Sequence, residues 1–205
     1  MSADPHGHHH HHHAAGTPFA GALIITVAFA GVEAVGGWLS GSLALLGDAG
    51  HMVTDATALG MAWLAAWIAR RPPSPRHTYG LGRAEILSAM INGLLMFGIV
   101  GAIVYAAVQR LHAAVPVSGG TVMAIAAVGL LINIGIAYVL SRGEKTMNTR
   151  GALLHVMGDM LGSFAALVAG AVIYATGWTP IDPILSIFIS VLILLSSVKL
   201  LGDAV

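Results

Sequence analysis

Six long apolar stretches are the feature that most restricts the folds this chain can adopt. They cover residues 18–37, 43–69, 84–109, 117–140, 151–176 and 183–202, with short polar connections between them. About 20 apolar residues in a helix cross the hydrocarbon core of a bilayer, whereas the strands of a membrane barrel are about half as long. Only 9% of the residues are charged, against roughly a quarter in soluble domains. We therefore predict an all-α membrane protein with six transmembrane helices.

Composition narrows the partners further. The formal net charge is +0, so nothing indicates a nucleic acid, and the absence of cysteine excludes disulfides and thiolate metal sites. Residues 1–16 form a polar tail with the run "HGHHHHHH", which is either a native metal-gathering segment or a purification tag. Residues 17–205 are expected to form one domain in the lipid bilayer.

Basic residues predict the orientation. Two loops on the same side of the expected bundle carry Arg70, Arg71, Arg76 and Arg83, and Arg142, Lys145 and Arg150. On the opposite side, only Arg110 lies near the end of a span. Because Lys and Arg collect in cytoplasmic loops, both basic loops and both termini should be cytoplasmic. In a bacterium the membrane would be the plasma (inner) membrane.

Two pairs of ionisable residues lie inside the apolar stretches. His51 and Asp55 are four residues apart, as are His155 and Asp159, so each pair shares one face of its helix. A carboxylate at the centre of a membrane helix costs about 2.5–3.5 kcal/mol on insertion scales, so these acids need partners. Two facing helices would offer two imidazoles and two carboxylates, the four ligands of a tetrahedral Zn²⁺ site.

Further residues in these stretches have less specific interpretations. Asp48, three residues before His51, is expected to orient that histidine rather than bind metal. Glu33 is expected to cap or pair with a polar group of a neighbouring helix, and Glu85 lies near the start of the third stretch. Small residues should let the second and fifth helices approach closely: Ala56, Ala58, Gly60, Gly158, Gly162 and Ser163.

An enzyme is the less favoured alternative. An intramembrane metalloprotease uses H-E-x-x-H with the glutamate as general base, but Met52 follows His51 and Val156 follows His155. A structural or proton-conducting helix bundle stays open, because polar pairs also hold membrane helices together. Two copies of the pair on different helices favour a metal or proton site.

Four segments resemble signatures of the cation diffusion facilitator family of divalent-metal transporters. They are "GSLALLGDAGHMVTDATALG", "HTYGLGRAEILSAMINGL", "NTRGALLHVMGDMLGS" and "DPILSIFISVLILLSS". The resemblance implies export of Zn²⁺ and related ions from the cytoplasm in exchange for protons, usually by a homodimer. It also implies that His51, Asp55, His155 and Asp159 bind the transported metal as substrate, with no cofactor.

The sequence departs from the family pattern in two places. It stops at Val205, without the cytoplasmic C-terminal domain that family members usually carry, so either the sequence is truncated or this is a short natural member. A dimer is then expected to form through membrane contacts such as "ILSAMINGLLMFG" and the sixth span. Leu81 or Gly82 replaces the loop histidine of some relatives, and His77 is expected to be solvated. With nitrogen and oxygen ligands and no sulfur, Zn²⁺ fits best, Cd²⁺ and Co²⁺ stay open, and a metal uniporter is the alternative mechanism.

Overall fold

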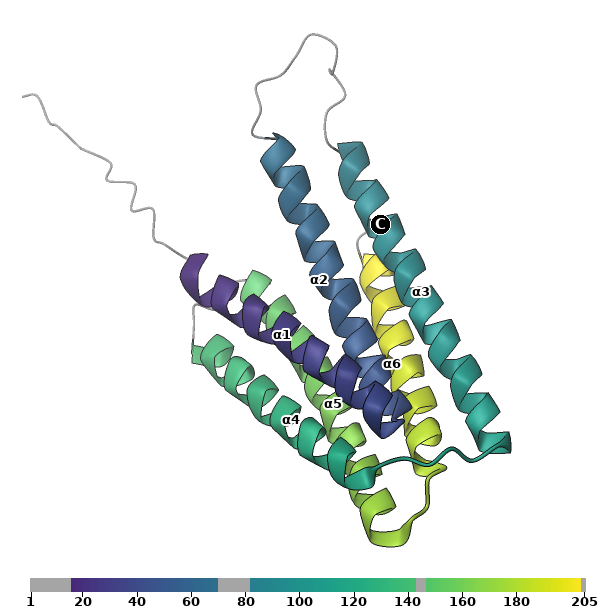
Figure 1. Cartoon of the computed structure of the whole chain (residues 1–205). Coiled ribbons are helices and arrows are strands. Elements are labelled where there is room, and N and C mark those ends of the chain that lie inside the picture. Colours follow the sequence, from purple (N-terminus) through teal and green to yellow (C-terminus); the bar gives the residue numbers. More distant parts are fainter. Residues whose placement is uncertain (1–15, 70–81, 143–146, 204–205) are drawn as a thin grey trace, which may run out of the picture.

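Six helices make up the structure, a computed structural model that describes residues 16–69, 82–142 and 147–203. Side chains are described for residues 24–57, 60–61, 90–142, 149 and 151–195. The helices are α1 (Gly16–Ser40), α2 (Leu43–Ala69), α3 (Gly82–His112), α4 (Gly119–Arg142), α5 (Met147–Thr176) and α6 (Ile181–Asp203) (Figure 1). The predicted all-α fold is confirmed. Most helices extend past the apolar stretches, because the helical backbone continues into polar residues at the ends.

The outer surface is apolar, as contact with lipid requires. Over the described residues, three helical stretches are long and apolar enough to cross a membrane: Met90–His112, Gly119–Arg142 and Gly151–Thr176. The shorter apolar stretches Ile24–Ser40 and Ile181–Leu195 lie in α1 and α6. Large apolar side chains such as Trp38, Leu94 and Leu131 point away from the bundle. A water-soluble surface does not carry so many, so the chain is an integral, multi-pass membrane protein.

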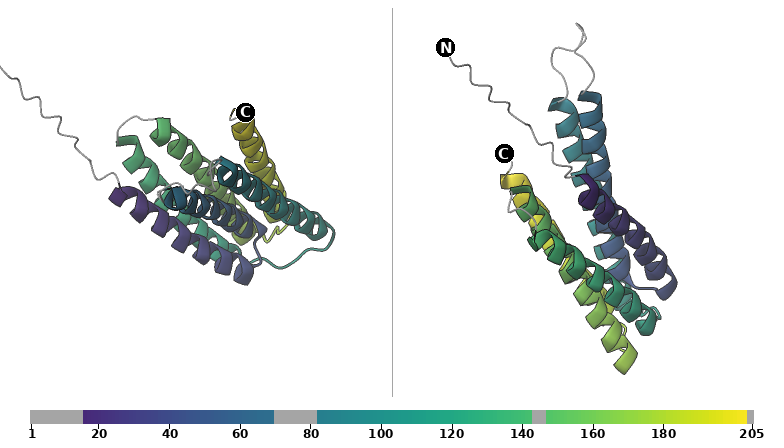
Figure 2. Two further views of the ribbon diagram at one scale, coloured as in Figure 1. Left: turned by 90° about the horizontal axis from the view of Figure 1, so that it is seen from above. Right: turned by 90° about the vertical axis from the view of Figure 1, so that its left-hand side faces the viewer.

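Successive helices run in opposite directions, and α1 and α4 are tilted against α2 and α3 (Figure 1). The further views show α4 and α5 side by side (Figure 2), and they are the most closely packed pair. A methyl group added at Gly119 would stand 2.8 Å from the carbonyl oxygen of Gly170, and one added at Gly170 would stand 2.6 Å from the amide nitrogen of Met123. The missing side chains therefore let the two backbones touch.

One end of the bundle, where α2 and α6 begin, is tied together by polar contacts. The Asp182 carboxylate accepts hydrogen bonds from Ser42 Oγ at 2.6 Å and from the Leu43 and Ala44 amides at 2.7 and 3.3 Å. These amides open α2 and have no partner inside that helix. Asp182 is fully buried, so an acid on α6 caps α2 from outside.

The connection between α3 and α4 closes the same end. It crosses beneath the start of α2 (Figure 1), and the Ser118 amide donates a hydrogen bond to the Ser40 carbonyl at 2.9 Å. Gly41, with φ +76°, makes the turn between α1 and α2, and its carbonyl accepts a hydrogen bond from Arg110. A core of small and branched apolar residues fills the space behind these contacts: Ala44, Leu45, Val122, Ala126 and Ala166.

Several sequence predictions fall outside this description. The histidine-rich tail, His77, Leu81, Lys145 and three of the arginines (Arg70, Arg71 and Arg76) lie outside the described residues. The side chains of Arg83, Glu85 and Arg150 are not among those described, although their backbone belongs to α3 or α5.

Candidate metal centre

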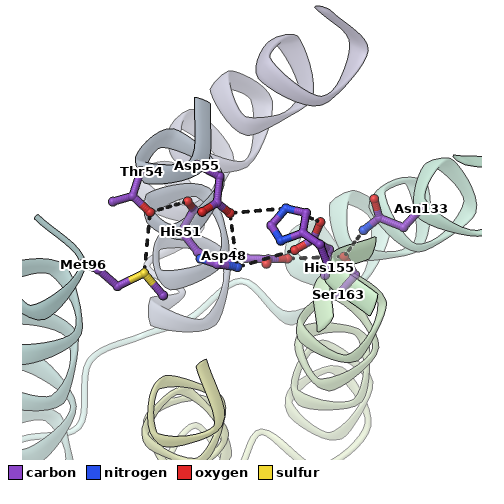
Figure 3. Close-up of polar contacts among 9 residues, drawn as sticks. Asp48, His51, Thr54, Asp55, Met96, Asn133, His155 and Ser163 are labelled. Carbon is purple, nitrogen blue, oxygen red and sulfur yellow. Dashed lines mark hydrogen bonds and ion pairs between the residues drawn. The ribbon is translucent and has the colours of Figure 1, made fainter. Parts of the chain in front are cut away.

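The two predicted histidine–aspartate pairs meet between α2 and α5. His51 Nε2 lies 3.4 Å from Asp55 Oδ2 and 3.7 Å from Asp159 Oδ1. His155 Nε2 lies 3.3 Å from Asp55 Oδ2 and 3.6 Å from Asp159 Oδ2. Figure 3 shows His51 and Asp55 from α2 opposite His155 from α5. Each side chain thus contacts both partners of the opposite type.

The spacing of these atoms fits a small divalent ion. Zinc lies about 2.0–2.1 Å from nitrogen and oxygen ligands, which sets the edge of a ligand tetrahedron at about 3.3–3.4 Å. The four nitrogen–oxygen distances, 3.3–3.7 Å, match or slightly exceed that edge. The imidazole centroids are 5.6 Å apart with their planes at 58°, so the rings do not stack. The arrangement needs only small movements to surround one ion.

Asp159 differs from the other three ligands. One ligand atom from each of His51, Asp55 and His155 lies within 4.8 Å of the others. Asp159 reaches the two imidazoles through different oxygens, Oδ1 toward His51 and Oδ2 toward His155. Three ligand atoms are therefore already gathered, and the Asp159 carboxylate must turn or bind through both oxygens to complete the set.

The site becomes more exposed from one side to the other. Asp159 and His51 are 4% and 14% exposed, whereas Asp55 and His155 are 24% and 45% exposed. Along α2, Asp55 lies one turn closer than His51 to the C-terminal end. Along α5, His155 lies one turn closer than Asp159 to the N-terminal end. The exposed side therefore faces the end of the bundle opposite the Asp182 contacts. Within the described part of the chain, Asp55 Oδ2 and Asp159 Oδ1 are buried and make no hydrogen bond, which leaves their lone pairs for a cation.

Asp48 is held by α5 rather than by its expected partner. Its Oδ2 accepts a hydrogen bond from Ser163 Oγ at 3.3 Å, and Ser163 in turn accepts one from the Asn133 side chain of α4 at 3.3 Å (Figure 3). The expected hydrogen bond to His51 is not formed, since Nδ1 of His51 is buried and has no hydrogen-bond partner in the described segments. Spacing on α2 placed Asp48 and His51 on one face but did not show that α5 offers a hydroxyl.

The small residues near the site have unequal roles. A methyl group at Gly162 would stand 2.8 Å from Asp48 Oδ1, so this glycine makes room for the carboxylate. At Gly60 and Gly158 an added methyl group would meet nothing within 4 Å. Among these three glycines, Gly162 alone lies at a close contact between α5 and α2 in the described residues, and the expectation for Gly60 and Gly158 was wrong.

Glu33 also departs from its expected role. Its side chain is 1% exposed, and neither carboxylate oxygen has a hydrogen-bond partner among the residues whose side chains are described. The expectation that it caps or pairs with a polar group was wrong. The role of Asp182 could not be predicted from the sequence, because an aspartate before a proline at the start of α6 is typical of the cap of its own helix.

Comparisons with known proteins agree with this geometry. Residues 20–205 match the family model described as the cation efflux transmembrane domain. The chain is 51% identical over 183 residues to zinc transporter ZitB of Escherichia coli (strain K12), covering 88% of this chain and 58% of that protein. It is 50% identical over 185 residues to ZitB of Yersinia pestis, covering 89% of this chain and 59% of that protein.

A more distant relative is the cadmium, cobalt and zinc/H(+)-K(+) antiporter of Bacillus subtilis (strain 168). The two are 38% identical over 177 residues, which cover 85% of this chain and 57% of the relative. The chain thus spans somewhat more than half the length of these relatives. Because the family model matches nearly the whole chain and the paired ligands converge in the structure, the chain belongs to the cation efflux (cation diffusion facilitator) family.

Proposed function

We propose that this chain carries Zn²⁺ across the membrane, exporting it from the cytoplasm in exchange for protons. The observation that carries the proposal is the set of four nitrogen–oxygen contacts, 3.3–3.7 Å long, between the pairs on α2 and α5. The names of its relatives, a zinc transporter and a cadmium, cobalt and zinc/proton–potassium antiporter, support the same substrate class. His51, Asp55, His155 and Asp159 would bind the ion as substrate.

Ligand chemistry supports zinc over other ions. Two imidazoles and two carboxylates without sulfur disfavour Cu(I), and Ca²⁺ or Mg²⁺ would need more oxygen ligands than this site has. Cd²⁺ and Co²⁺ accept the same four ligands and are included as further substrates.

Proton exchange follows from the ligands themselves. Metal binding needs both imidazoles neutral and both carboxylates ionised, so protons compete with metal for the same side chains. A carrier whose site faces each side of the membrane in turn would release metal where protons are abundant. This coupling distinguishes the proposal from a metal uniporter and from a structural or proton-conducting bundle.

The direction of transport rests on orientation. The two predicted basic loops join α2 to α3 and α4 to α5, at the end toward which Asp55 and His155 are exposed. With those loops and both termini in the cytoplasm, the described conformation would receive metal from that side. In a bacterium this places the chain in the plasma (inner) membrane.

We further propose that the chain forms a homodimer through its membrane surface. On α3, within the segment identified from sequence, Met90, Leu94 and Phe97 are more than half exposed. Side chains of this kind pack against lipid or against a second copy equally well, so the oligomeric state has to be measured.

The test is metal uptake into proteoliposomes containing the purified chain. Zn²⁺ should enter faster when the receiving compartment is acidified, with Cd²⁺ and Co²⁺ slower and Mg²⁺ and Ca²⁺ not carried. The membrane potential is clamped, and vesicles without protein are the control. Zinc flux indifferent to the pH gradient would indicate a uniporter, and the absence of any metal flux would indicate a structural or proton-conducting bundle.

A further inference from the structure

Glu33, in the middle of α1, is the one buried acid among the described residues that neither belongs to the metal site nor accepts a hydrogen bond. Its side chain is 1% exposed, and among the described residues neither Oε1 nor Oε2 finds a hydrogen-bond donor. Asp48, by contrast, accepts the hydrogen bond from Ser163. An ionised carboxylate without donors is strongly disfavoured in a dry interior, and such a group usually takes up a proton or a cation.

The surroundings of Glu33 are shaped to hold its carboxyl group. A methyl group added at Gly129 of α4 would stand 3.1 Å from Oε1 of Glu33 and 2.6 Å from Cε1 of Phe29, one turn earlier on α1. The absence of a side chain at Gly129 therefore admits both groups. Phe29, Ala30 and Met52 form a buried apolar cluster here, against which Ile125 and Ile132 of α4 pack.

The charged groups that act on Glu33 are acidic. Helix α1 packs against α2 and α4. Gly129, beside Oε1 of Glu33, lies one turn before Asn133 on α4, and Asn133 is joined through Ser163 to Asp48 of α2. On α5, Asp159 lies one turn before Ser163, so Asp48 and Asp159 are the acids on this side of Glu33. On α4, the basic residue is Arg142, at the last position of the helix. With the metal site empty, two acidic neighbours and no cation oppose ionisation of Glu33. A divalent ion bound by Asp55, Asp159 and the two neutral imidazoles cancels the two negative charges of the site and so removes most of that opposition.

We propose that Glu33 is a proton-binding site separate from the metal ligands, which holds a proton while the metal site is empty and releases it when a divalent cation binds. The O–H bond of the carboxyl group breaks, the proton passes to water, and the carboxylate stays near the bound cation. The inference rests on the proposed function and deepens it, because one exchanged proton then comes from a residue that does not touch the metal.

The experiment counts protons released as Zn²⁺ binds to the purified full chain in weakly buffered detergent solution near pH 7. In Glu33→Gln the side chain keeps its shape and loses its proton. We expect this variant to bind one Zn²⁺ per chain through the four ligands while releasing about one proton fewer per ion. Asn92→Ala is the matched control, because Asn92 has a buried oxygen without a hydrogen bond and does not titrate. Its proton count should equal that of the unaltered chain.

Two results separate this inference from the proposed function. An unaltered chain that binds no Zn²⁺ overturns the function and the inference together. Zinc binding by Glu33→Gln with an unchanged proton count overturns the inference alone. A second measurement needs no variant: zinc added to the unaltered chain should remove an infrared carbonyl band of a protonated carboxyl group. If that band does not change, Glu33 is not the proton donor, whether or not Glu33→Gln folds.

Discussion

Replacing Asp182 with alanine should strongly destabilise the protein. The carboxylate holds the Ser42 hydroxyl at 2.6 Å and the Leu43 and Ala44 amides at 2.7 and 3.3 Å, and it is fully buried. A hydrogen bond to a charged group contributes about 1.5–3 kcal/mol. The three bonds share one acceptor and do not add independently, and removing one partner from a buried charged network costs about 3–5 kcal/mol. We expect a loss of about that size, because the donors at the start of α2 lose their acceptor.

Thermal unfolding in mild detergent, followed by circular dichroism, measures the effect. At roughly 2–4 °C per kcal/mol for a chain of this length, Asp182→Ala should lower the midpoint by about 6–20 °C. Asp182→Asn keeps one acceptor oxygen and should lose less. Ser186→Ala is the control, since the Ser186 hydroxyl donates to the Asp182 carbonyl within the same helix at 2.7 Å, and its loss should cost less than about 1 kcal/mol. A midpoint for Asp182→Ala no lower than that of Ser186→Ala would refute the assignment of Asp182 as the cap of α2.

Three further predictions concern the metal site and assembly. Asp55→Ala and Asp159→Ala should each weaken Zn²⁺ binding by at least about 100-fold in calorimetry, because each removes a metal ligand. Both variants should still insert and fold, because a carboxylate that is costly inside the membrane is removed. Near-normal transport by Asp159→Ala would contradict the site. Zinc binding should weaken as pH falls from about 7.5 to 6, where imidazoles take up protons, and His155→Asn should flatten this dependence as well as weaken binding. The purified chain should run as a dimer in mild detergent by light scattering, and a strictly monomeric chain that still transports would show that dimerisation is dispensable.

The parts of the structure that depend on one helix at a time could be predicted from the sequence. Apolar length alone locates all six helices, and the four-residue spacing places His51 with Asp55 and His155 with Asp159 on single faces. The occurrence of the same histidine–aspartate spacing on two different helices led to the prediction that the two pairs meet. The meeting itself required α5 to pack against α2, which no periodicity encodes.

The features that the sequence did not predict are contacts between side chains on different helices. Asp182 lies 140 residues from Ser42, and nothing in the local pattern at either position reveals the other. Asp48 and Glu33 show the same limit, because helical periodicity says which way a side chain faces but not whether the facing helix offers a hydroxyl, a glycine or another acid. Buried polar residues in membrane helices therefore have their partners decided by tertiary packing.

Because Asp182 fixes the start of α2, this helix can rotate as a rigid body about that end. Its start is tied to α6, while His51 lies about 12 Å and Asp55 about 18 Å further along the helix at 1.5 Å per residue. A tilt of α2 by about 5° around that fixed end moves His51 by about 1 Å and Asp55 by about 1.6 Å. Those displacements are large against zinc–ligand bonds of about 2 Å. A few degrees of rigid-body rotation can therefore open or close the four-ligand site, with every helix intact.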